Sequence, residues 1–160
     1  MKWLSLFWIN ITLFMLAANV AAADMDGFRG LTWGSDIEVI RGSDPKLVEG
    51  MMAVMPGVKA YQRTDEDLDF GGIKADSITY TFYKGKLTSV SIDFRGFDNF
   101  ETLLNYCKKT FGPVTGSVIL RMEQYAGFDS PKTGVMLLYQ LSMQTTNYGR
   151  LYLYSKKFLE

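Results

Sequence analysis

The stretch SITYTFYKGKLTSVSIDF, residues 77–94, decides the fold of this chain. Apolar side chains alternate with polar ones on both sides of Lys84-Gly85-Lys86, a pattern typical of two half-buried strands joined by a tight turn. A two-residue turn would pair Tyr80 with Ser89 and place the two apolar faces on opposite sides. Because a slip of one residue inverts a strand face, we predict a three-residue loop with a bulge, which pairs Tyr80 with Val90.

A helix is predicted directly after this hairpin. Its apolar side chains recur at helical spacing and form one stripe, composed of Phe100, Leu103, Leu104, Cys107 and Phe111. Asp98 is expected to cap the start of the helix, and Gly112-Pro113 to end it. The helix should therefore cover residues 99–111 and pack its stripe on one face of the sheet.

Shorter periodic segments complete the expected fold. Ser35 and Glu38 match a capping box and predict a short helix near residues 36–41. Alternating apolar residues predict further strands within 58–63, 135–141 and 151–154. The segment 118–128 predicts one strand, and an interruption within it stays open. The fold class is therefore α+β: an antiparallel β-sheet of about five or six strands, with one main helix packed on one face and a short N-terminal helix.

The first 23 residues have the three parts of a secretory signal peptide. Lys2 supplies positive charge, an apolar run extends from Trp3 to Leu16, and Ala21-Ala22-Ala23 offers a cleavage site. The run is shorter than the roughly 20 residues that an uncleaved membrane anchor would need. No cysteine follows it for lipid attachment. We expect residues 1–23 to be removed, and residues 24–160 to form a single α+β domain in the periplasm with no membrane anchor.

The composition excludes several chemistries. The chain has no histidine and a single cysteine, Cys107, which excludes Ser-His-Asp and Cys-His nucleophiles and the usual zinc sites. The position of Cys107 in the helix stripe predicts a buried thiol. Without Lys2, 16 basic and 17 acidic residues leave a net charge of −1, which gives no electrostatic case for nucleic acid. We expect a protein that is not an enzyme and has no cofactor.

Two groups of side chains are candidate metal ligands. The carboxylates at Asp65, Asp67, Asp69 and Asp76 have the spacing of calcium ligands, although Phe70 stands where a calcium loop has glycine. Ordinary solvated turn charges are the alternative.

The thioethers of Met51, Met52 and Met55 form the second group and would suit Cu(I). Packing in an irregular core, or lining an apolar groove for a peptide or lipid, are the alternatives for these methionines.

Three tyrosines are candidate binding residues. Tyr83 alternates with the apolar positions of the hairpin, and Tyr152 and Tyr154 alternate with Leu151 and Leu153. They are expected to point away from the core. A contact surface or the ordinary outer face of a sheet would both explain them.

Several motifs together resemble a family of exported proteins. They are Phe28-x-Gly30-Leu31-x-Trp33-Gly34, Tyr80-x-Phe82-x-x-Gly85-Lys86-Leu87-x-x-Val90, residues 104–113, and Leu151-Tyr152-Leu153-Tyr154-Ser155-Lys156. This pattern resembles small exported proteins of Gram-negative, often delta-proteobacterial, bacteria that carry no assigned function. The resemblance implies a compact periplasmic domain and supplies no catalytic residue. The chain is also similar to small accessory proteins of outer-membrane assembly, which pair helices with a three-stranded sheet.

Two functions stay open at this point. The first is a non-catalytic binding or accessory module of the cell envelope, which would contact another envelope protein or peptide through a sheet face or a free sheet edge. The second is a carrier of a small ligand or of calcium or copper. It would use the acidic loop, residues 65–69, or the methionine cluster of Met51, Met52 and Met55.

Overall fold

The computed structural model describes residues 24–41, 46–47, 55–120, 123–141 and 147–158. The predicted signal peptide, Met51 and Met52 therefore lie outside the described residues. The elements run in the order β1 (Gly27–Phe28), β2 (Leu31–Thr32), α1 (Glu38–Arg41), β3 (Lys46–Leu47), β4 (Val58–Gln62), β5 (Asp69–Phe70), β6 (Ile73–Lys74), β7 (Ser77–Tyr83), β8 (Lys86–Arg95), α2 (Phe97–Phe111), β9 (Gly116–Leu120), β10 (Glu123–Asp129), β11 (Thr133–Gln140), β12 (Tyr148–Ser155) and a 3₁₀ turn (Lys156–Phe158).

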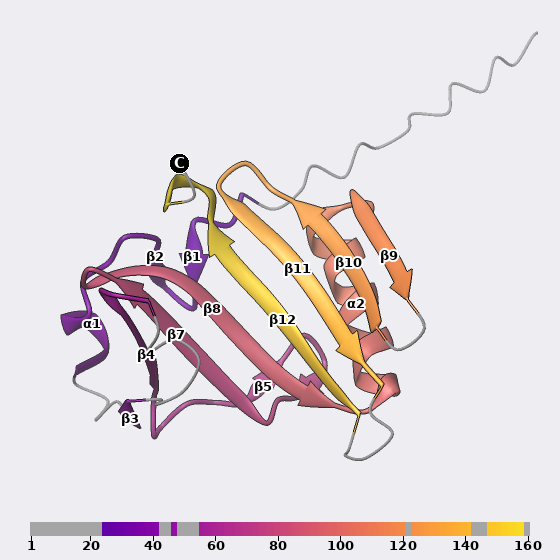
Figure 1. The fold of residues 1–160 in the computed structure, drawn as a ribbon, viewed down its shortest axis with the longest axis horizontal. Helices are drawn as coiled ribbons and strands as arrows, with labels where there is room; N and C mark the ends of the chain where they lie inside the picture. Colours follow the sequence, from indigo (N-terminus) through magenta and orange to yellow (C-terminus); the bar gives the residue numbers. More distant parts are fainter. Residues whose placement is uncertain (1–23, 42–45, 48–54, 121–122, 142–146, 159–160) are drawn as a thin grey trace, which may run out of the picture.

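One twisted antiparallel sheet dominates the described structure (Figure 1). Its strand order is β3-β4-β7-β8-β12-β11-β10-β9, so the two long strands β8 and β12 lie at its centre. Seven of these strands have five or more residues, and β3 adds a two-residue edge. The α+β class is confirmed, with more strands than the five or six predicted.

The β7–β8 hairpin has the predicted register but reaches it differently. Tyr80 pairs with Val90, as expected from the apolar faces. The loop is nevertheless the two-residue Lys84-Gly85 turn, with φ values of 49° and 79°. The extra residue is taken up by a bulge at Thr88, whose hydroxyl donates to the carbonyl oxygen of Thr81 at 3.2 Å. The predicted bulge is confirmed. The predicted three-residue loop was wrong, because a bulge within the strand restores the apolar faces without it.

The C-terminal half forms a meander of four strands. The segment 118–128 is interrupted, as the second alternative had it, and gives two strands, β9 and β10, which pair antiparallel. A continuous strand was wrong; the polar residue Gln124 lies on the same face as Ala126 and hides the alternation of β10. Strands β11 and β12 confirm the predicted alternation, with Leu137, Leu151 and Leu153 fully buried. Leu141, expected to continue β11, lies beyond that strand and is exposed.

Helix α2 covers one face of the sheet, and Figure 1 shows it behind β10 and β11. The predicted stripe is confirmed: Phe100, Leu103, Cys107 and Phe111 are buried, and Leu104 is partly buried. The helix starts two residues earlier than predicted, and its cap is Gly96, at φ 88°, without a side-chain hydrogen bond. Asp98 lies in the first turn, where its charge suits the helix dipole, and is not the cap.

The N-terminal motif folds as a small hairpin, β1–β2, which the sequence did not predict. Arg29 and Gly30 form its two-residue turn, and both have positive φ. Phe28 is buried against the rings of Phe70 and Tyr80, with ring centroids 5.6 and 5.9 Å apart. The indole N–H of Trp33 donates to the hydroxyl of Thr133 at 2.7 Å, which ties the hairpin to β11.

Only one helical turn, α1, occurs where a two-turn helix was predicted. The Ser35 hydroxyl lies 3.1 Å from the Thr32 hydroxyl, and the Ser35 N–H donates to the carbonyl oxygen of Thr32 at 3.1 Å. Gly34 has φ 85°, and its N–H donates to the carbonyl oxygen of Leu87 at 2.8 Å. This hydrogen bond joins the segment to the central hairpin.

The two faces of the sheet differ sharply. The helix-side face carries the core side chains of β7, β8, β11 and β12, among them Tyr80, Ile92, Leu137 and Leu151. The opposite face of β8, β12, β11 and β10 is called the open face. Its outward residues are Ser89, Ser91, Asp93, Arg95, Tyr148, Arg150, Tyr152, Tyr154, Gly134, Met136, Leu138, Gln140, Glu123, Tyr125, Gly127 and Asp129.

Candidate functional site

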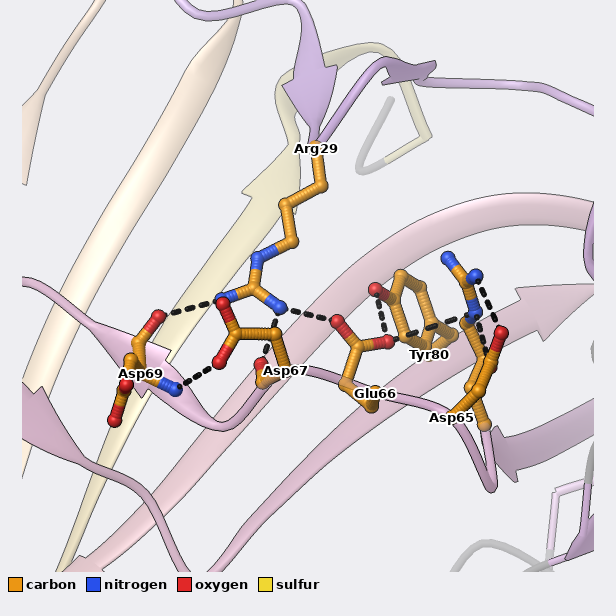
Figure 2. Close-up of polar contacts among 7 residues, drawn as sticks. Arg29, Asp65, Glu66, Asp67, Asp69 and Tyr80 are labelled. Atoms are coloured by element: carbon orange, nitrogen blue, oxygen red, sulfur yellow. Dashed lines mark hydrogen bonds and ion pairs between the residues drawn. The ribbon is translucent and has the colours of Figure 1, made fainter.

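The acidic loop binds an arginine of its own chain (Figure 2). Arg29 extends from the turn of the β1–β2 hairpin and donates to the carboxylate of Glu66 and to the carbonyl oxygen of Asp67. It also donates to the carbonyl oxygen of Asp69 at 2.7 Å. A guanidinium with its fork of N–H groups is suited to contact several oxygens at once. The loop and the hairpin are therefore locked together.

Glu66 is the centre of this cluster. Its carboxylate is 5% exposed and also accepts a hydrogen bond from the hydroxyl of Tyr80 at 2.8 Å. Arg63 Nε lies 3.7 Å from the second carboxylate oxygen. Burial, together with the hydrogen bond to Glu66, raises the pKa of Tyr80 above its ordinary value. Tyr80 thus stays protonated and keeps donating to the carboxylate across the physiological pH range.

The four calcium candidates lie in different local arrangements. The carboxylate of Asp67 accepts the backbone N–H of Asp69 at 2.9 Å, an Asx turn. Asp65 faces Arg63, with a 3.4 Å contact to Nε. Asp76 forms a bidentate pair with Arg95 at 2.7 and 2.9 Å. Among the described residues, no group of three or more acidic or cysteine side chains is placed to hold a metal ion.

The structure places one of the three copper candidates. Met55 is 62% exposed and stands just before the turn that leads into β4. Its partners in the proposed cluster, Met51 and Met52, lie outside the described residues, so the copper hypothesis stays a prediction.

The candidate tyrosines divide between two places on the outward side of the sheet. Tyr152 and Tyr154 lie in the middle of the open face, on β12. Tyr83 is 39% exposed and lies at the end of β7, beside the hairpin turn, where the Lys84 ammonium is 5.1 Å from its ring centroid. The prediction that these side chains point away from the core is confirmed.

A polar network that the sequence did not predict organises the open face. Asp93 on β8 accepts hydrogen bonds from Arg150 at both carboxylate oxygens, the second at 2.9 Å. The same carboxylate accepts from the hydroxyls of Tyr148, at 2.5 Å, and Ser77, at 3.1 Å. Arg150 Nη1 donates to the hydroxyl of Tyr152 at 3.0 Å.

Arg150 also lies between two aromatic rings. Its guanidinium carbon is 5.4 Å from the ring centroids of both Tyr148 and Tyr152, within the range of a cation–π contact. Burial by itself would lower the pKa of Arg150, but the hydrogen bonds to Asp93 and Tyr152 outweigh it and the pKa rises. Burial and the bond to Asp93 raise the pKa of Tyr148. The network keeps both tyrosine rings in fixed positions.

Cys107 is confirmed as a core thiol. It is fully buried, and burial raises its pKa to about 12. A thiol with so high a pKa is protonated at neutral pH and is a poor nucleophile.

Sequence reasoning found Tyr152 and Tyr154 on the open face and missed Tyr148 and the charged residues that fix these rings. Asp93 and Arg150 are 57 positions apart and become neighbours only because β8 pairs with β12. Arg29 and Glu66 were missed for the same reason. One signal was present: Asp93 and Arg150 are charged residues inside strands that otherwise alternate apolar and small polar or aromatic side chains.

Comparisons with protein-family models, with curated proteins and with solved structures give no match to this chain. Within the described ranges, neither α1 nor α2 has the length and apolar character that crossing a bilayer requires.

Proposed function

We propose that this chain is a non-catalytic binding module of the cell envelope that contacts a protein partner through its open face. The observation that supports this is the composition of the outward positions of β11 and β12. They are Gly134, Met136, Leu138, Gln140, Tyr148, Arg150, Tyr152 and Tyr154. Protein interfaces are enriched in Tyr, Met and Arg and depleted in Lys and Glu, and these eight positions follow both trends.

The rigidity of this surface supports the same proposal. Tyrosine side chains lose little conformational entropy on binding, and here the Asp93–Arg150 pair already orders Tyr148 and Tyr152. Met136 is 36% exposed, and it pairs with Tyr152 of β12 on one side and with Gly127 of β10 on the other. An apolar centre surrounded by hydrogen-bonding groups is the usual anatomy of a protein-binding patch.

The proposed compartment is the periplasm, reached by removal of residues 1–23. The direct test is the mass of the mature protein from the periplasmic fraction. A chain starting at Asp24 is expected; a chain that retains Met1, or one found in the cytosol, would overturn this part of the proposal.

The binding surface is tested by photo-crosslinking in the producing cells. A benzophenone amino acid replaces Met136 on the open face, and in a matched control it replaces Lys109, an exposed residue of α2. We expect one envelope protein to be captured from position 136 and not from position 109. Adding Tyr152→Ser should remove the adduct, whereas Tyr83→Ser should leave it. Equal capture from both positions, or none from position 136, would refute the open face as the contact surface.

A further inference from the structure

A second surface lies at the far edge of the sheet, on the helix side. Strand β9 pairs with β10 alone, so one side of its backbone has no strand partner within the described residues. Edge strands usually carry charges, proline or a bulge that prevent the addition of another strand. Residues Gly116–Leu120 have the sequence GSVIL, with no charged residue and no proline. This edge is therefore left open to strand pairing.

Beside this edge is a groove between α2 and the sheet. It has a volume of about 170 Å³ and is lined by Phe100, Leu104, Lys108, Val114, Ser117, Ile119, Gln124, Tyr125 and Ala126. A dry cavity of about 150 Å³ in another protein holds a benzene molecule, so this groove has room for one large apolar side chain. Among the described residues that line the groove, Lys108 is the single charged one.

The two exposed β-branched residues of β9 point to opposite faces of the sheet. Ile119 is 79% exposed, pairs with Gln124 and lines the groove. Val118 is 50% exposed and pairs with Tyr125, so it points to the opposite side of the sheet. A strand added to β9 would direct alternate side chains into the groove and away from it.

We propose that the β9 edge binds an extended peptide segment of another protein, with one large apolar side chain in the groove and an acidic group beside Lys108. This inference is independent of the proposed open-face function, because it concerns the other side of the sheet. The size of the surface favours a peptide over a second copy of this chain. The exposed edge is one five-residue strand about 17 Å long, and the groove beside it has room for one large side chain, which a short extended segment matches.

The test uses the mature protein and blocked synthetic peptides of about seven residues, the length of a typical strand. The probe peptide has a central phenylalanine flanked by two aspartates, with serine and threonine elsewhere. Two matched peptides replace the aspartates with lysines, or the phenylalanine with serine. Binding is measured by fluorescence anisotropy and located by amide chemical shifts. We expect the acidic phenylalanine peptide to bind at least tenfold more tightly than either control, with shifts in β9 and the second half of α2.

Two exposed positions of one strand provide matched variants that should fold normally. Ile119→Asn replaces an apolar side chain at the mouth of the groove with an uncharged polar one and should weaken the probe peptide at least tenfold, while Val118→Asn should leave its affinity within twofold. Lys108→Glu should reverse the preference between the acidic and basic peptides. Equal loss in both β9 variants, no binding of the probe, or shifts confined to the open face would overturn the proposal. A dimer broken by Ile119→Asn alone would assign the edge to a second copy and also overturn it.

Discussion

Replacing Glu66 with glutamine removes the negative charge that joins the N-terminal hairpin to the acidic loop. The carboxylate accepts one hydrogen bond from Arg29 and one from Tyr80, and it is 5% exposed. A hydrogen bond to a charged group contributes roughly 1.5–3 kcal/mol. Breaking a buried ion pair by changing one partner costs roughly 3–5 kcal/mol.

The cost of Glu66→Gln should fall at the lower end of that range. The glutamine keeps one acceptor oxygen, and the side chains of Arg29 and Arg63 are 26% and 28% exposed, so water recovers part of their solvation. We therefore expect the free energy of unfolding to fall by about 3 kcal/mol. At roughly 3–4 °C for each kcal/mol, the melting temperature should fall by about 10 °C.

Urea denaturation followed by tryptophan fluorescence measures this change. Trp33 is the sole tryptophan beyond residue 23, and it lies in the segment that the cluster anchors. The matched control is Asp65→Asn, because the side chain of Asp65 is 59% exposed and its pair with Arg63 should contribute less than about 0.5 kcal/mol. A double-mutant cycle with Arg29→Met should give a coupling energy above about 1 kcal/mol.

Two results would refute this account of the acidic loop. The first is a Glu66→Gln variant that unfolds within about 0.5 kcal/mol of the native chain. The second is stabilisation of the native chain by calcium at about 5 mM, a concentration above the dissociation constants of extracellular calcium modules, provided that the stabilisation is lost when Asp67 and Asp69 are replaced by asparagine. The second result would restore the calcium hypothesis.

Three further predictions follow from the core, the sheet and the open face. Gly149→Ala should cost about 3 kcal/mol in urea denaturation, because a Cβ there would lie 2.2 Å from the buried ring of Phe94. Gly134→Ala should cost less than about 1 kcal/mol, because the Cβ there would meet the far end of the Tyr154 side chain, which is only partly buried. Burial raises the pKa of the Cys107 thiol from 9.0 to about 12, so above pH 9 the folded chain keeps a proton that the unfolded chain loses. The free energy of unfolding should therefore be unchanged below pH 9 and should fall by up to about 1.4 kcal/mol as the pH rises to 10. Cys107→Ala should abolish this loss. Asp93→Asn should cost about 2 kcal/mol and let Tyr148 ionise at a lower pH in a spectrophotometric titration, since the carboxylate that favours its neutral form is gone; an unchanged tyrosine titration would contradict the network.

The periodic parts of the fold follow from the sequence alone. The stripe from Phe100 to Phe111 predicts α2, and the alternation in 77–94 predicts both β7 and β8 and the pairing of Tyr80 with Val90. These elements are predictable because the alternation of apolar and polar residues is repeated several times within one segment, so that a single exception does not change the pattern. The buried state of Cys107 follows from the same repetition.

Short segments are not predictable in this way. The β1–β2 and β5–β6 hairpins have two-residue strands, too short to show a period. The division of 118–128 into β9 and β10 is hidden by Gln124. The register of the hairpin predicts a bulge, but it does not give the position of that bulge at Thr88.

The sequence thus determined the α+β class, the main helix, the central hairpin and the outward direction of the tyrosines. Tertiary structure alone decided which charges meet, since Arg29 and Glu66 are 37 positions apart and Asp93 and Arg150 are 57 apart. It also decided the strand order, which leaves one side of β9 without a strand partner among the described residues. The physical reason is that periodicity records burial, a property of each residue in its own segment, whereas ion pairs and grooves depend on the order in which strands pair.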